Sequence, residues 1–62
     1  MKILIFIVGA RKVLIEVPDG IDVAWTPQGY NVWRDGKLIA VFTADTDYRI
    51  VALRIKQMLN PT

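Results

Sequence analysis

The sequence predicts an α+β fold that is mainly β, with five short antiparallel strands in hairpins followed by one C-terminal amphipathic helix packed on the sheet. Up to residue 42, short runs rich in β-branched and aromatic residues are separated by turns that contain glycine. From Asp45 onward the apolar residues recur with a period of about 3.6 instead of about two. We expect residues 1–62 to form a single small domain, with the helix at about residues 46–59.

The first hairpin is predicted from residues 3–17. Residues 3–8 are a continuous apolar run rich in β-branched residues, which is typical of a strand covered on both faces. Gly9-Ala10-Arg11 provides a turn, and residues 12–17 then alternate between two faces. One face carries Val13, Ile15 and Val17, and the other carries Lys12, Leu14 and Glu16. Pro18-Asp19-Gly20 ends the strand, because proline has no amide hydrogen to donate and glycine accepts positive φ.

Residues 21–42 predict a three-stranded meander. Thr26-Pro27-Gln28-Gly29 suits a type I turn, and Asp35-Gly36 suits a two-residue type I′ turn. The second turn sets the expected cross-strand pairs, which are Trp33 with Leu38, Val32 with Ile39, Asn31 with Ala40 and Tyr30 with Val41.

The two faces of this meander are expected to differ. The core face carries Ile21, Val23, Trp25, Tyr30, Val32, Ile39 and Val41. The opposite face carries Asp22, Ala24, Asn31, Trp33, Leu38, Ala40 and Phe42. Its centre, Trp33 with Leu38 and Phe42, is too apolar to be left in water, so we expect it to pack on another polypeptide. The first expectation is a second copy of the chain, with residues 3–8 joining that contact.

The predicted helix begins after Asp45 or Thr46 as N-cap, with Asp47 in its first turn and Pro61 after its end. One stripe should cover the core face of the sheet, and it consists of Tyr48, Val51, Ile55, Met58 and Leu59. Ile50 and Leu53 lie outside this stripe among basic residues. They indicate either a second contact surface or scattered surface aliphatics.

The composition favours an assembly over an isolated monomer. A core of this size rarely supplies more than about 3–5 kcal/mol. The chain has no cysteine and no histidine, which excludes a disulfide and argues against a structural zinc site, and we expect no metal and no cofactor. Because 53% of the residues are hydrophobic, there is more apolar surface than one small core absorbs, and we interpret the excess as an interface.

The apolar run at residues 3–8 is also shorter than a signal peptide core of about 7–15 residues or a membrane span of about 20. We therefore expect a cytoplasmic protein with no membrane association.

The residues available for catalysis are few. Serine, cysteine and histidine are absent, and most of the five aspartates have structural explanations in turns or at the start of the helix. Glu16 and Asp22 flank one turn, and a surface pair is a better explanation for them than a catalytic dyad, which needs a water-excluding cleft. We expect a protein that is not an enzyme.

The residues instead suggest a non-catalytic binding or regulatory module. We expect it to act as a homodimer and to recognise another protein, as an inhibitor or adaptor does. Trp and Arg are enriched at binding hot spots. The expected protein-interface residues are Trp33, Leu38, Phe42, Ile50, Leu53 and Arg54.

Parts of the chain resemble the carbon storage regulator family of small RNA-binding translational repressors. The similar positions are Met1, Ile3, Leu4, Val8 and Gly9, then Gly29, Val32, Ala40-Val41 and Arg49-Ile50. The resemblance implies an intertwined homodimer that binds GGA-containing RNA through basic residues on the first strand and just after the fifth. This chain has Ile5, Phe6 and Ile7 on the first strand and Thr43-Ala44-Asp45 after the last, so the RNA-contact residues are not matched.

A nucleic-acid-binding regulator is therefore the alternative function. The net charge is +2, and Tyr30 and Trp33 could stack bases beside Arg34. The alternative contacts are Arg11, Lys12, Arg34, Lys37 and Arg49.

Overall fold

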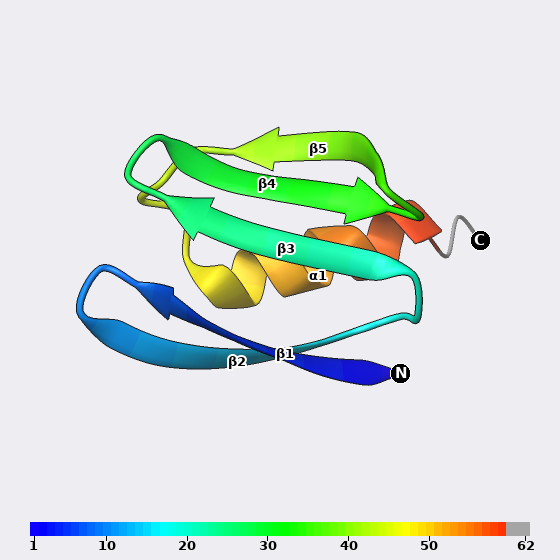
Figure 1. Cartoon of the computed structure of the whole chain (residues 1–62), viewed down its shortest axis with the longest axis horizontal. Coiled ribbons are helices and arrows are strands. Elements are labelled where there is room, and N and C mark those ends of the chain that lie inside the picture. The colour runs from blue at the N-terminus through cyan, green and yellow to red at the C-terminus, as the bar shows by residue number, and fades with distance from the viewer. Residues whose placement is uncertain (60–62) are drawn as a thin grey trace.

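The computed structural model describes residues 1–59, which form five antiparallel strands in two sheets and one C-terminal helix (Figure 1). The elements are β1 (Lys2–Val8), β2 (Arg11–Val17), β3 (Ile21–Thr26), β4 (Gly29–Arg34), β5 (Lys37–Phe42) and α1 (Tyr48–Leu59). β1 and β2 pair as one sheet, and the other three strands form the second sheet in the order β3-β4-β5. The predicted fold class is confirmed.

The two sheets lie side by side, and α1 runs behind them (Figure 1). β1 passes next to β3, and Lys2 Nζ lies 3.2 Å from Asp22 Oδ1 between these strands. The helix contacts β2, and its buried residues are in one core cluster with residues of the three-stranded sheet, so its apolar stripe faces both sheets. The core is therefore enclosed by the inner faces of the two sheets and by one side of the helix.

Within residues 1–59 the core is small, and its buried side chains are apolar apart from the phenol of Tyr30. Its buried residues are Val13, Ile15, Val17, Ile21, Tyr30, Val32, Val51 and Ile55. The alternation predicted for β2 is confirmed, since Val13, Ile15 and Val17 are buried and Lys12, Leu14 and Glu16 are exposed. Phe6 of β1 meets Tyr30 of β4 edge-to-face, with 6.3 Å between ring centroids, so an aromatic contact joins the two sheets.

The β4–β5 register differs from the prediction beyond the turn. Asp35 and Gly36 have φ of 51° and 83°, as a type I′ turn requires, and Trp33 lies opposite Leu38. A bulge then leaves Ile39 unpaired, so that Val32 faces Ala40 and Tyr30 faces Phe42. One extra residue exchanges the faces of all residues after it.

The bulge corrects three assignments. Phe42 and Ala40 pack against the core, and Val41, predicted for the core, is 62% exposed on the outer face. Phe42 is therefore not part of the outer apolar surface that was predicted around Trp33.

The start of α1 also differs from the prediction. Asp47 is the N-cap: its Oδ1 accepts the backbone N–H of Arg49 at 2.9 Å, and its carbonyl accepts those of Ile50 and Val51. Two side-chain hydrogen bonds fix the loop before the helix. The Trp25 indole Nε1 donates to the Ala44 carbonyl at 3.0 Å, and the Tyr30 phenol Oη donates to the Thr46 carbonyl at 2.9 Å.

On the helix, Val51 and Ile55 are buried as predicted, but Met58 is 44% exposed and Ala52 packs against the core. The expected role of Pro61 lies outside the described residues.

Gly29 is a position where any side chain should destabilise the fold. It begins β4 with φ of 145°, and a Cβ atom there would collide with the backbone carbonyl oxygen of Phe42. We expect Gly29→Ala to lower the free energy of unfolding by at least about 2 kcal/mol, because neither the strain nor the backbone clash is easily relieved. Urea unfolding at fixed protein concentration measures the change.

Gly9→Ala is the matched control, since Gly9 also has positive φ but has nothing within 4 Å of the added atom. Its cost should be about 1 kcal/mol. Equal destabilisation by the two substitutions would contradict the clash at Gly29.

Candidate interaction surfaces

The outer face of the β1–β2 sheet is apolar at its centre. We define the β1–β2 outer face as Ile3, Ile5 and Ile7 of β1 with Lys12, Leu14 and Glu16 of β2. The three isoleucines are 62%, 59% and 55% exposed, and Leu14 is 55% exposed. Residues 3–8 were expected to be covered on both faces, but within this chain only the side of Leu4, Phe6 and Val8 packs on the core.

The charges on this face stand at opposite ends of it. The cross-strand pairs are Ile3 with Glu16, Ile5 with Leu14 and Ile7 with Lys12. An apolar centre is therefore bordered by a carboxylate at one end of β2 and an ammonium group at the other. Within residues 1–59, neither Lys12 nor Glu16 forms an ion pair.

A second apolar surface lies on the outer face of the three-stranded sheet. We define the Trp33 surface as Trp33, Leu38 and Val41. Leu38 is 51% and Val41 62% exposed, and Trp33 is half-buried opposite Leu38 and Asp22. Trp33 and Leu38 were predicted from the sequence for this surface, and Val41 takes the place of Phe42 because of the bulge.

The predicted interface residues of the helix lie on another side of the molecule. Ile50 and Leu53 are 49% and 53% exposed, and Arg54 is exposed with its Nη1 donating to Gln57 Oε1 at 3.4 Å. Because α1 covers the inner faces of the sheets, these residues do not join the Trp33 surface. The structure thus divides the predicted protein interface into two separate surfaces.

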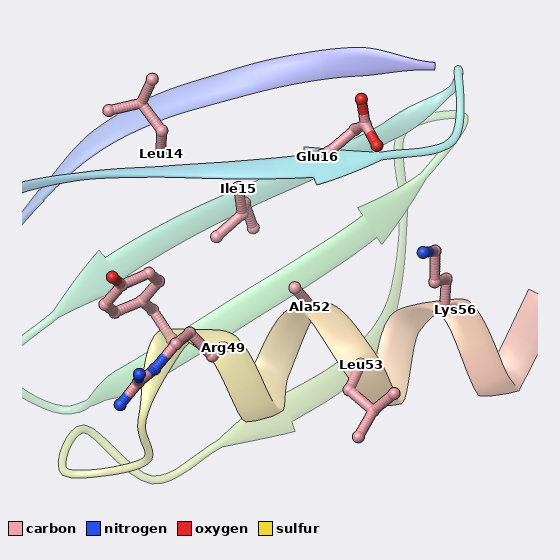
Figure 2. Close-up of a pocket in the computed structure, with 8 residues that line it drawn as sticks. Leu14, Ile15, Glu16, Arg49, Ala52, Leu53 and Lys56 are labelled. Atoms are coloured by element: carbon pink, nitrogen blue, oxygen red, sulfur yellow. The ribbon is translucent and has the colours of Figure 1, made fainter.

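A shallow groove between β2 and α1 was missed from the sequence. It has a volume of about 330 Å³ and is lined by Leu14, Ile15, Glu16, Tyr48, Arg49, Ala52, Leu53 and Lys56. Figure 2 shows Ile15 and Ala52 pointing toward each other across it, whereas Leu14 and Leu53 point away. The groove depends on how the helix docks on β2, which no local pattern in the sequence specifies.

A polar corner surrounds the start of α1. Asp47 accepts two hydrogen bonds from the Arg49 guanidinium, at 2.7 Å (Oδ2) and 3.1 Å (Oδ1), in addition to the backbone bond. These bonds lower the pKa of Asp47 from 3.8 to about 2 and raise the pKa of Arg49. Burial raises the pKa of the Tyr30 phenol, which faces the same corner. Arg49 is therefore held by a carboxylate.

The five cations of the alternative nucleic-acid site do not form one patch. Arg11 and Lys12 start β2, and Arg11 lines the polar corner with Arg49. Arg34 and Lys37 flank the β4–β5 turn at the opposite end of the molecule (Figure 1). Asp45 and Asp47 lie in the polar corner, where they oppose the approach of a phosphate.

The carboxylate pair considered from the sequence also has separate surroundings. Asp22 is paired with Lys2, and Glu16 belongs to the β1–β2 outer face. Residues 1–59 contain no group of three histidine, cysteine, aspartate or glutamate side chains placed to hold a metal ion. No helix in the described part of the chain is long and apolar enough to cross a membrane.

Comparisons with protein-family models, curated proteins and solved structures find no match to this chain. The functional interpretation therefore depends on the surfaces of the molecule.

The Asp47–Arg49 contact should make stability depend on pH. Because the pKa of Asp47 is lower in the folded chain, its contribution is complete above 3.8 and is lost as the pH falls toward about 2. We expect the free energy of unfolding to decrease over this interval, and to decrease less in Asp47→Asn, which keeps an N-cap oxygen without the charge. Urea unfolding at several pH values measures the slopes.

Arg49→Gln tests the same contact from the other side, because it removes the guanidinium that holds the carboxylate. It should reduce the pH dependence as well. If both variants kept the wild-type slope, the contact would not be the cause.

Proposed function

We propose that this chain is a non-catalytic binding module that assembles with itself and recognises another protein, in the manner of an inhibitor or adaptor. The observation that carries the proposal is that both sheets expose an apolar outer face, although residues 1–59 form a single core. Antiparallel sheets with one solvated face normally carry polar side chains there. Two such faces on one small domain suit two different contacts.

The β1–β2 outer face is the better candidate for self-association. Its centre consists of aliphatic side chains that are more than half exposed, and burial of such side chains is the main favourable term in association. A small domain with a small core gains stability from a second subunit.

The Trp33 surface is the better candidate for the protein partner. Trp33 offers a large aromatic side chain beside Leu38 and Val41, and Arg34 and Lys37 follow at the turn. Tryptophan and arginine are the residue types that most often dominate binding energy. The expected partner therefore presents an apolar side chain bordered by carboxylates.

The nucleic-acid alternative receives less support from the arrangement of charges. Single-strand binders combine stacking aromatics with a continuous basic track. Here the cations are divided between the two ends of the molecule, and Arg49 is bound to Asp47.

Light scattering tests self-association and the alternative together. We expect a solution mass of twice the 7.0 kDa chain mass, unchanged when a mixed RNA pool is added at low or at physiological salt. Uptake of RNA that weakens steeply as salt rises would favour the alternative, because phosphate contacts release counterions. A mass of 7.0 kDa at all concentrations would refute self-association.

A phage-displayed random peptide library tests the Trp33 surface. We expect selected peptides to combine apolar and acidic residues, and to bind Trp33→Ser at least about tenfold more weakly than wild type, the range for loss of a hot spot. Leu53→Ser is the matched control, since it removes an exposed aliphatic side chain from the helix. Peptides that bind both variants like wild type would exclude the Trp33 surface.

A further inference from the structure

We propose that two copies of the chain pack their β1–β2 outer faces together around a two-fold axis. This axis lies in the plane between the two sheets, perpendicular to the strands, and passes over the Ile5–Leu14 pair. This inference rests on the self-association in the proposed function and specifies its geometry. In the resulting dimer, Lys12 of each copy meets Glu16 of the other.

The apolar centre of the face suits packing against a second sheet. Along β1, each residue on the outer side is an isoleucine, and Met1, 62% exposed, precedes them with the same alternation. Sheets that pack face to face lie about 10 Å apart with their strands aligned to within about 30°. Such a layer would cover Ile5 and Leu14 at its centre, where the exposed aliphatic area is concentrated.

The charges at the ends of β2 select the orientation of the second copy. Rotation about an axis perpendicular to the strands reverses the strand direction but keeps β2 over β2. The Lys12 end of one copy then lies over the Glu16 end of the other, Leu14 meets Leu14, and Ile5 meets Ile5. The symmetry creates this ion pair twice.

Other orientations leave the charges without partners. Rotation about an axis parallel to the strands places Lys12 over Ile7 and Glu16 over Ile3. Each charge would then be desolvated against an aliphatic side chain, which is strongly unfavourable. Of these two orientations, only the one that reverses the strand direction makes the charges of this face complementary to those of a second copy.

The same pattern favours a second copy over other occupants. One ammonium group and one carboxylate cancel, so the face has no net charge to attract an anionic membrane surface or a nucleic acid. Lys12 and Glu16 form no ion pair within the described chain, so both side chains are available to pair with a second copy.

Charge exchange tests the geometry. Lys12→Glu places like charges together at both ends of the interface, and Glu16→Lys does the same with the opposite sign. We expect each variant alone to raise the dimer dissociation constant by about tenfold or more in sedimentation equilibrium, because like charges across an interface are strongly unfavourable. An equimolar mixture of the two variants should form a heterodimer with near wild-type affinity, and so should the homodimer of the doubly exchanged variant.

Two controls separate the outcomes. Lys37→Glu makes the same change of charge on the other hairpin and should leave the dimer unaffected, and circular dichroism should show that all variants are folded. If the single variants dimerised like wild type, or if mixing them restored nothing, the proposed geometry would be wrong, although self-association through another surface would stand. A wild-type chain that is monomeric up to about millimolar concentration would overturn both the self-association and its proposed geometry.

Discussion

One helix has to cover the inner faces of two sheets, and the rest of the structure depends on this constraint. α1 presents a single apolar stripe, and its buried residues Val51 and Ile55 belong to the same core cluster as residues of β2 and of the three-stranded sheet. No other element of residues 1–59 is left to cover the outer faces. A chain of this length cannot add a third layer, since a small domain buries only about 60% of the surface that it exposes when unfolded. Its excess apolar residues must therefore lie outside.

The sequence predicts the elements well where polar and apolar residues alternate or where a turn has specific chemistry. The inward face of β2 and the Asp35-Gly36 turn are examples, since both signals are local. The bulge at Ile39 has no such signal, because residues 38–42 are all apolar and fit either register. The extra residue brings both Ile39 and Phe42 against the core, so packing decides the register. Tertiary contacts likewise decide the helix start, because Asp45, Thr46 and Asp47 are all adequate N-caps.

The interaction surfaces also divide into a part that local sequence signals predict and a part that depends on tertiary packing. Trp33 and Leu38 could be predicted because they are next to the turn that fixes their register, whereas Phe42 lies beyond the bulge. In β1 every residue from 3 to 8 is apolar, so periodicity indicates neither which side faces the core nor that the other side is exposed. That assignment depends on β2, whose buried valines and isoleucine define the inner side, and on the ladder that pairs the two strands. The same ladder places Lys12 and Glu16 at opposite ends of the isoleucine row, which the sequence alone does not show.

The free edge of β5 disfavours growth of the three-stranded sheet by addition of another strand. The edge of β1 that does not pair with β2 lies beside β3, and within residues 1–59 no strand pairs with the outer edge of β5. β5 carries the bulge, and bulges disturb the regular row of donors and acceptors that another strand needs. Association through that edge is thus impeded, while both outer faces stay accessible. Because these faces belong to different sheets, a dimer formed through the β1–β2 outer face leaves the Trp33 surface of each copy free for a different partner.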